Sequence, residues 1–247
     1  MDVVMGGIMP LSTIDYEGKS ATVIFFGGCN FRCRFCYSHA ILDARMCTTM
    51  NAQNVYSLVM EGRKLIEAVV FDGGEPTAQP DALVELVKMF KAAGLLVKID
   101  TNGSNVGVLA ELLARNLVDY IALDVKAPLD NEREYSHITQ RDAKQALHNL
   151  TELMRLKGAF NFFLECRTTI VPGLIFRQHD IEGIAKSIGQ HADRYVLQQF
   201  TPVKGCVDKS YDNVQSPKRE ELVALAKTAK KHIADVRIRT SEGEEKV

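Results

Sequence analysis

Three cysteines lie close together in the segment GGCNFRCRFCYSHA, and their thiolates could hold a metal centre. Cys29, Cys33 and Cys36 have the spacing C-x3-C-x2-C. Structural zinc sites take four ligands, whereas three thiolates on a four-iron cubane cluster leave one iron open to a chelating small molecule. The spacing favours an iron–sulfur cluster, although His39 could complete a Cys3His zinc site, and the spacing alone leaves both open.

The remaining cysteines, Cys47, Cys166 and Cys206, are scattered and lack a C-x-x-C partner. This pattern is typical of a metal site in a reducing cytoplasm rather than of a disulfide framework. We expect a single cluster, and we expect Cys166 to pack in the core.

A second candidate motif is FDGGEPT, which follows a strand-like run. Gly73 and Gly74 would allow the backbone to approach a ligand without a Cβ in the way. Glu75 could shape this loop or accept a hydrogen bond. An ordinary turn between a strand and a helix is the alternative reading, because glycines often end strands.

Two aspartates are expected near the ends of neighbouring strands, Asp100 in DTNG and Asp124 in LDVK. Two carboxylates brought together need a proton or a cation between them, and Thr101 could add an oxygen ligand. The alternative for Asp100 is a turn around Asn102–Gly103, where such residues are favoured. Both interpretations stay open.

Two basic residues could complete a binding pocket. Lys126 lies two residues after Asp124, so both face the same side of a strand, and a buried lysine must find an anion. Arg167 lies in an otherwise apolar strand, where arginine usually pairs with a carboxylate or a sugar. By alternation, Cys166 points to the opposite side.

The elements that must position these residues alternate along the chain. Short apolar runs rich in β-branched and aromatic residues predict six strands, at 21–28, 67–74, 95–102, 118–126, 160–171 and 193–200. Amphipathic runs predict helices over 81–93, after Ser104, over 141–157 and after Ser216; the run after Ser104 holds Val108, Leu109, Leu112 and Leu113. The segment VRIRT predicts a last strand.

This alternation predicts an α/β fold with a parallel sheet and helical crossovers. Pattern alone does not separate a partial barrel from a doubly wound open sheet, but in both the chemistry lies at the carboxyl ends of the strands. No linker splits the chain, so we expect a single domain over residues 1–247.

The composition sets broad limits on function. Of 247 residues, 46% are hydrophobic and 25% are charged, and the net charge of −1 lacks the basic excess of a nucleic-acid binder. No apolar run approaches the ~20 residues that span a bilayer, and no basic region precedes an apolar core at the N-terminus. We expect a cytoplasmic protein with no membrane and no evident nucleic-acid partner.

Taken together, the motifs resemble the radical S-adenosylmethionine (SAM) superfamily. The triplet with an aromatic residue, Phe35, before its last cysteine is similar to the family signature, and FDGGEPT resembles its glycine–glycine–glutamate loop. DTNG and LDVK resemble the activating enzymes of glycyl radical enzymes. LSTIDYEGK and YVLQQFTP are similar to the subgroup named anaerobic ribonucleoside-triphosphate reductase activating protein. The likeness runs from about Leu11 to about Pro202.

The resemblance implies a partial (βα)6 barrel of the TIM type with parallel strands, whose core spans about 20–202 before a short helix and strand. It implies a 4Fe–4S cluster on the three cysteines, SAM bound to the open iron, and reductive cleavage that gives a 5′-deoxyadenosyl radical. It also implies a monovalent cation beside Asp100 and Asp124. The cofactor-binding residues that it implies are Phe35, Tyr37, Gly73, Gly74, Glu75, Asp100, Thr101, Asp124, Lys126 and Arg167, with no catalytic group beyond that site.

The resemblance further implies an anaerobic oxidoreductase that installs a glycyl radical on a partner such as anaerobic ribonucleotide reductase, with a flavodoxin- or ferredoxin-type reductant. One departure is Tyr37–Ser38, where these proteins commonly have an asparagine in the second position. A radical SAM enzyme that modifies a small molecule, a peptide or RNA is one alternative. A non-enzymatic iron–sulfur or zinc protein is another.

Overall fold

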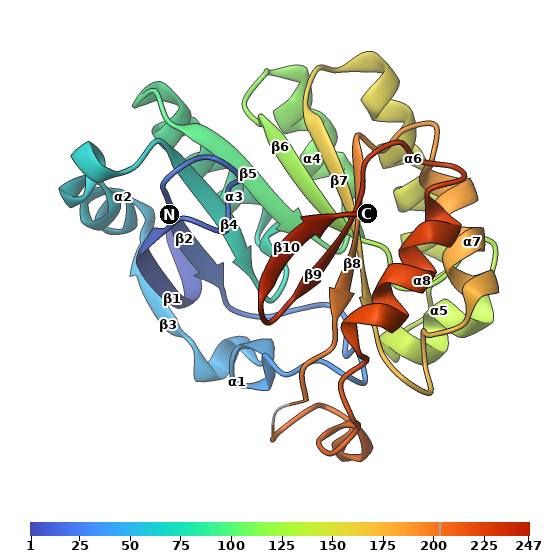
Figure 1. Ribbon diagram of the computed structural model, residues 1–247. Helices are drawn as coiled ribbons and strands as arrows, with labels where there is room; N and C mark the ends of the chain where they lie inside the picture. Colours follow the sequence, from blue (N-terminus) through green and yellow to red (C-terminus); the bar gives the residue numbers. More distant parts are fainter. Residues whose placement is uncertain (203) are drawn as a thin grey trace. The chain divides into compact units, whose positions relative to one another are not determined.

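Strands and helices alternate along the computed structural model, which describes residues 1–202 and 204–247 (Figure 1). The described residues fall into two compact units. The first unit comprises Met1–Asn30, Ala40–Ala122 and Phe160–Phe163, and the second comprises Phe31–His39, Leu123–Ala159 and Leu164–Val247.

The first unit is built on a mixed sheet with the strand order β3-β1-β2-β4-β5. β2, β4 and β5 are parallel to one another, and β1 pairs antiparallel with both β2 and β3. The strands are β1 (Asp2–Ser12), β2 (Ala21–Phe26), β3 (Thr48–Asn51), β4 (Ala68–Gly73), β5 (Leu96–Thr101) and the beginning of β6 (Tyr120–Asp124).

Helices cover one face of this sheet. The ring of Phe90 on α3 packs against Phe71 of β4 and against Tyr56 of α2, with ring centroids 6.2 Å and 5.3 Å apart. The helices of this unit are α1 (His39–Leu42, whose first residue belongs to the second unit), α2 (Ala52–Glu61), α3 (Pro80–Ala92) and α4 (Val106–Ala114), with single 3-10 turns at Ala44–Met46, Arg63–Leu65 and Pro76–Ala78.

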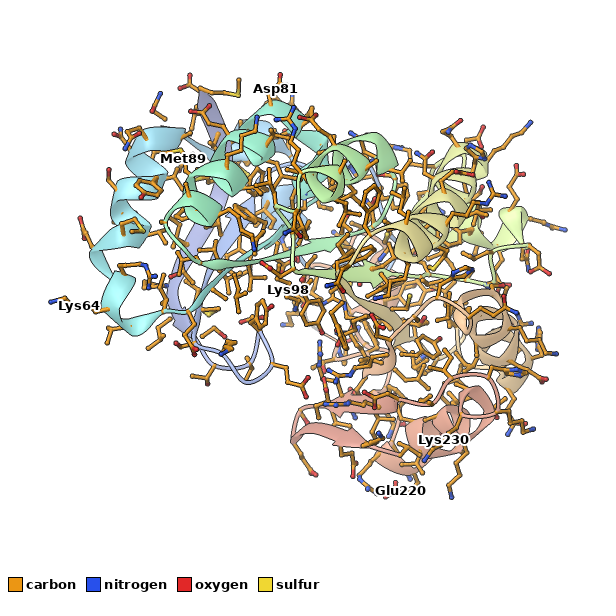
Figure 2. All side chains as sticks on the ribbon, turned by 90° about the horizontal axis from the view of Figure 1, so that it is seen from above. Lys64, Asp81, Met89, Lys98, Glu220 and Lys230 are labelled. Carbon is orange, nitrogen blue, oxygen red and sulfur yellow. The ribbon has the colours of Figure 1, made fainter. Side chains whose placement is uncertain are left out.

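The opposite face of the first sheet carries a small buried cluster. Ala21 and Val23 of β2 lie beside Ala68 and Val70 of β4, all fully buried. Parallel register places Lys98 of β5 next to Val70. A lysine therefore lies on an apolar face, and Figure 2 shows Lys98 in the interior of this unit.

The second unit has a sheet in the order β7-β8-β9-β10, in which β7, β8 and β9 are parallel and β10 returns antiparallel. Its helices α7 and α8 pack on each other, and α8 covers β8 and β9. The elements are α5 (Glu132–Thr139), α6 (Lys144–Ala159), β7 (Phe163–Ile170), α7 (Gln178–Ile188), β8 (Arg194–Gln199), a 3-10 turn at Lys209–Tyr211, α8 (Arg219–Ala229), β9 (Val236–Thr240) and β10 (Gly243–Lys246).

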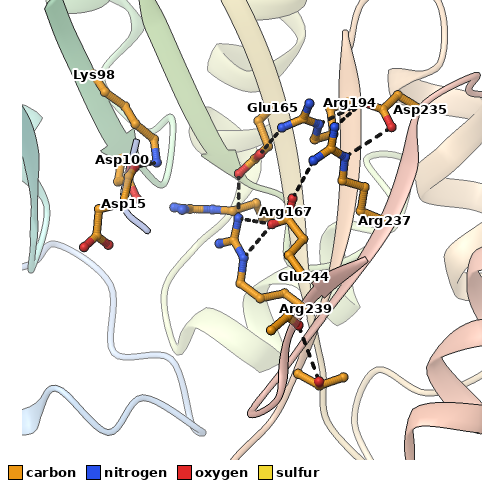
Figure 3. Close-up of polar contacts among 12 residues, drawn as sticks. Asp15, Lys98, Asp100, Glu165, Arg167, Arg194, Asp235, Arg237, Arg239 and Glu244 are labelled. Atoms are coloured by element: carbon orange, nitrogen blue, oxygen red, sulfur yellow. Dashed lines mark hydrogen bonds and ion pairs between the residues drawn. The ribbon is translucent and has the colours of Figure 1, made fainter. Parts of the chain in front are cut away.

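Charged side chains line the strands of this second unit (Figure 3). Glu165 of β7 is 1% exposed and faces Arg194 at 3.7 Å and Arg239 at 3.5 Å. Arg194 also bonds Asp235 at 2.9 Å. Because buried charges must be paired, these contacts keep the Glu165 carboxylate compensated.

All six predicted strands are confirmed to within three residues, and VRIRT is confirmed as β9. The helices α3, α4, α6 and α8 also match the predictions. The sequence patterns missed β1, β3 and β10 and the helices α1, α2, α5 and α7. No helix among the described residues is long and apolar enough to cross a membrane.

Candidate active site

The cysteine loop begins directly after β2, in the first unit. The N–H of Gly27 donates to the carbonyl of Val4 at 2.9 Å, and the N–H of Gly28 donates to the carbonyl of Ile41 at 2.6 Å. These bonds fix the main chain that leads into Cys29.

The side-chain amide of Asn102 lies beside Cys29, with Nδ2 4.0 Å from Sγ. The same nitrogen donates to Oδ1 of Asn30 at 2.9 Å, which fixes the orientation of the amide. An N–H donor near a metal-ligating sulfur tunes the charge on that sulfur. Sequence reasoning used Asn102 only as a turn residue, although its place in DTNG was a usable signal.

The two glycines of the FDGGEPT loop are required by close packing of main chains. A Cβ on Gly74 would lie 2.0 Å from the carbonyl oxygen of Gly28, and a Cβ on Gly73 would lie 2.5 Å from the main chain of Phe26. Gly73 also has φ +117, which side chains disfavour. The structure thus gives these glycines a role in seating the cysteine loop; their predicted contact with a cofactor stays a prediction.

Glu75 is 1% exposed, and its carboxylate binds the protein itself. Oε1 accepts from the N–H of Thr77 at 3.0 Å, its hydroxyl at 2.6 Å and the hydroxyl of Thr101 at 2.7 Å. Oε2 accepts from the N–H of Asn102 at 2.7 Å. Burial raises the pKa of this carboxyl, and the four donors oppose that rise. Glu75 therefore joins the loops after β4 and β5, as the loop-shaping interpretation predicts.

Asp100 and Thr101, at the end of β5, both have partners within the first unit. Oδ1 of Asp100 lies 3.2 Å from Nζ of Lys98. The hydroxyl of Thr101 accepts from the N–H of Gly103 at 3.0 Å while it donates to Glu75.

Cys33 and Cys36 belong to the second unit, where a turn joins them. The N–H of Cys36 donates to the carbonyl of Cys33 at 2.9 Å. The end of α5 supports this turn, since the N–H groups of Arg32 and Arg34 donate to the carbonyls of residues 139 and 138 at 2.9 Å and 3.0 Å. The last carbonyls of α5, which have no hydrogen-bond partner within the helix, thereby hold the cysteine loop.

A segment distant in sequence lies along the other side of the same turn. The N–H of Val207 donates to the carbonyl of Cys36 at 3.1 Å, and that of Asp208 donates to the carbonyl of Arg34 at 2.8 Å. The sequence patterns gave no sign of this contact.

The side chain of Arg34 reinforces this contact. Its Nε and Nη2 donate to Oδ2 of Asp208 at 2.9 Å and 2.6 Å, and Nη1 lies 2.8 Å from Nε2 of His137. The guanidinium also lies 6.0 Å from the ring centroid of Tyr211. The residue between two cysteines is thus held by three side chains.

Asp124 in the second unit is the centre of a charged group. Lys126 Nζ lies 3.1 Å from Oδ2, and Arg167 Nε lies 3.1 Å from Oδ1. Burial alone would raise the pKa of Asp124, but its two cationic partners hold it below its usual range. Burial likewise disfavours the Lys126 ammonium, and the charges of Asp124 and Cys33 outweigh this and raise its pKa.

The positive charge near Asp124 also acts on the thiols. Burial raises the pKa of Cys36, while hydrogen bonds from Ser38 and the charge of Lys126 lower it in part. A thiol with a raised pKa gives up its proton when it binds a metal. Iron loading at this position should therefore release a proton.

The predicted aromatic residues differ in environment. Phe35 packs edge-on against Phe200, with centroids 6.3 Å apart, whereas Tyr37 is 62% exposed. Cys166 is fully buried as predicted. His39 lies 3.2 Å from the carbonyl of Tyr37.

The donor set fits an iron–sulfur cluster. Three soft thiols follow β2, with the amide of Asn102 beside one of them and a lysine charge near the others. The described residues contain no group of three His, Cys, Asp or Glu side chains placed to hold a single metal ion. A cubane does not require such a group, because each thiolate binds a different iron.

Comparison with known proteins decides the family. The model of the Radical SAM superfamily matches residues 23–187. The chain belongs to the radical SAM superfamily. A protein of Methanocaldococcus jannaschii, provisionally named a glycyl-radical enzyme activating enzyme, is 37% identical over 98% of both chains. The pyruvate formate-lyase-activating enzyme of Clostridium pasteurianum is 29% identical over 68% of both chains.

The solved structures show the fold. A radical SAM methyltransferase from Sphaerobacter thermophilus superposes with a TM-score of 0.74 at 16% identity, over 94% of this chain and 69% of that one. The predicted α/β class, a partial barrel of mostly parallel strands, is confirmed. As a radical SAM protein, the chain is an enzyme whose family uses a 4Fe–4S cluster and SAM.

Proposed function

We propose that this radical SAM enzyme installs a glycyl radical on a partner enzyme. The main support is the 37% identity, over nearly the whole of both chains, to a relative provisionally named as an activating enzyme of this kind. The similarity to pyruvate formate-lyase-activating enzymes points to the same class of substrate.

Cys29, Cys33 and Cys36 would hold the cluster in this proposal, with SAM bound next to it. The reduced cluster would supply the one electron needed to cleave SAM to methionine and a 5′-deoxyadenosyl radical, which would take a hydrogen atom from a glycine Cα. The protein positions the cofactor and excludes side reactions.

Lys126 and Arg167 are the proposed partners of the SAM carboxylate. Nζ of Lys126 and Nε of Arg167 each lie 3.1 Å from the Asp124 carboxylate. Ammonium and guanidinium groups bind carboxylates through strong charge-assisted hydrogen bonds, which is the chemistry that the SAM carboxylate requires. Asp124 supports this role because it holds both side chains in place.

For Phe35, Tyr37, Gly73 and Gly74, we propose contacts with bound SAM. Glu75 and Thr101 act as positioning residues instead, since their oxygens bind each other and the neighbouring main chain. We further propose an anaerobic ribonucleotide reductase as the partner, a flavodoxin- or ferredoxin-type protein as the electron donor, and the cytoplasm as the location.

The test is electron paramagnetic resonance on an anaerobic mixture of the reconstituted protein, a reductant, SAM and a ribonucleotide reductase with a C-terminal glycyl loop. We expect a glycyl radical signal together with one 5′-deoxyadenosine for each radical formed. A partner with that glycine replaced by alanine is the matched control and should give no signal.

Cleavage of SAM without a radical on any glycyl radical enzyme would refute the activating role while leaving the family chemistry intact. Radical transfer to a peptide, an RNA or a small molecule would then have to be examined as the alternative.

A further inference from the structure

The two acids predicted to share a monovalent cation each have a cationic side chain of their own. Asp100 faces Lys98 within the first unit, and Asp124 faces Lys126 and Arg167 within the second. Three positive side chains therefore compensate two carboxylates before any ion is added.

Lys98 is unusual because it lies on an apolar face. It is next to Val70 in the parallel register, and Val70 belongs to the buried cluster on that side of the sheet. The Lys98 side chain is 5% exposed and that of Asp100 is 7% exposed. Residues two apart on a strand face the same side, so the sequence K-I-D brings the two charges together.

The ammonium group of Lys98 has three kinds of neighbour. It donates to the main-chain carbonyl of Asp15 at 2.5 Å, forms an ion pair with Oδ1 of Asp100 at 3.2 Å and lies 4.9 Å from the ring centroid of Tyr120. The positive charge is thus met by a hydrogen bond, an ion pair and an aromatic face. Figure 3 shows the Lys98 side chain extending toward Asp100, with Asp15 nearby.

The surroundings hold this arrangement in place. The ring of Tyr16 packs edge-on against Tyr120 with centroids 5.4 Å apart. The hydroxyl of Ser12 donates to the Asp15 side chain at 2.5 Å, which fixes the turn that presents the Asp15 carbonyl. The ammonium therefore sits among a carbonyl oxygen, a carboxylate oxygen and an aromatic face.

A potassium ion would use the same kinds of partner. Potassium and ammonium carry the same charge and are similar in size, and a free cation beside Asp100 would be repelled by the Lys98 charge. We propose that the Lys98 ammonium occupies the place of a monovalent cation beside Asp100, which makes the first unit independent of added potassium or sodium. Lys98 is thus a positioning residue for the loop that begins at Asp100.

The test compares unfolding midpoints of the apo protein in potassium, sodium and choline chloride at equal ionic strength. The unfolding midpoint of the wild-type protein should be the same in all three salts. In Lys98→Met the buried Asp100 carboxylate loses the positive charge beside it, so potassium or sodium should raise the midpoint in a saturable way. The rise should be about 3–6 °C at ten times the dissociation constant of the ion.

Two further variants complete the comparison. Lys98→Met/Asp100→Asn removes both charges and should show no specific response. Lys91→Met is the matched control, because Lys91 pairs with Asp119 in the same unit but at a partly exposed place where water can solvate the carboxylate. It should lose stability equally in all three salts.

A saturable response of the wild-type protein to potassium or sodium would overturn the proposal, even if Lys98→Met failed to fold. A folded Lys98→Met protein whose unfolding midpoint does not respond to potassium or sodium would also overturn the proposal. The affinity of the cluster-loaded wild type for SAM, measured in the same salts, should also be unchanged within twofold. None of these measurements involves a glycyl radical enzyme, so they stand apart from a failure of the proposed function.

Discussion

The main-chain N–H of Asn102 donates to Oε2 of Glu75 at 2.7 Å, which ties the loop after β5 to the loop after β4. Asn102 in turn places its side-chain amide 4.0 Å from Sγ of Cys29. The buried carboxylate thereby positions a donor beside the Cys29 sulfur without touching that sulfur.

Replacing Glu75 by glutamine should destabilise the protein by about 1–3 kcal/mol. The new amide would turn N–H donors toward the N–H of Asn102 or toward the threonine hydroxyls, and a buried donor without an acceptor costs about this much. Urea unfolding of the apo protein measures the change. Glu67→Gln is the control, because Glu67 is about half exposed and should lose less than about 0.5 kcal/mol. Equal losses of stability in the two variants would show that the buried hydrogen bonds of Glu75 stabilise the protein no more than the contacts of the exposed Glu67 do.

Gly74→Ala should prevent the cysteine loop from seating. The added Cβ would lie 2.0 Å from a main-chain oxygen of Gly28, which cannot rotate away. Gly158→Ala in α6 meets nothing within 4 Å and should stabilise the protein by up to about 1 kcal/mol, as alanine does in helices. Iron content after reconstitution and thermal unfolding report the two effects. A Gly74→Ala protein with a full iron content would contradict the packing argument.

The three cysteines proposed as cluster ligands should differ from Cys47 in the effect of their replacement. Alanine at Cys29, Cys33 or Cys36 should abolish SAM cleavage and reduce bound iron well below four per chain. Sγ of Cys47 lies 3.7 Å and 3.6 Å from the carbonyls of Ile41 and Asp43, so Cys47→Ala should keep both properties. Iron analysis and chromatographic detection of 5′-deoxyadenosine decide between these outcomes, and an equal loss in all four variants would mean that the ligand set is wrong.

The titration of Asp208 should report the contact that holds the turn between Cys33 and Cys36. Hydrogen bonds from the side chain and main chain of Ser210, followed by that from Arg34, lower its pKa from 3.8 to about 2. Because the pKa is depressed, the stabilisation is present above pH 3.8 and is lost as the pH falls toward 2.

Carbon-13 NMR of the Asp208 carboxyl measures this pKa. Ser210→Ala should raise it toward 3.8, and Arg34→Met should raise it by a smaller amount because the Ser210 bonds persist. An unchanged pKa in both variants would show that neither contact forms in solution.

The parallel strands could be read from the sequence because each is a nearly continuous apolar run that is buried on both faces. β1 was missed because Gly6, Gly7 and Pro10 interrupt its apolar pattern, although pairing on both sides holds it as a strand. Tertiary pairing there outweighs local preference.

The site was predictable where its residues fall in short motifs, and only there. The cysteines, the glycines and Asp124 can be recognised from the spacing of their motifs in the sequence. Lys98 could not be recognised in this way, because a lysine within a strand is ordinarily expected to face solvent. The bond between Arg34 and Asp208 joins residues 174 positions apart, and no local pattern carries information over that distance.

The segment that bears the three cysteines is held largely by main-chain atoms. Gly27 and Gly28 bond Val4 and Ile41, while Arg32 and Arg34 bond the last turn of α5. Such bonds do not depend on which side chains the supporting residues carry. Substitutions at Val4 and Ile41 that fit the available space should therefore be tolerated, whereas insertion or deletion of a single residue between the anchors should displace the cysteines. The number of residues between these anchors is thus a constraint on the loop, in addition to the glycines that its packing requires.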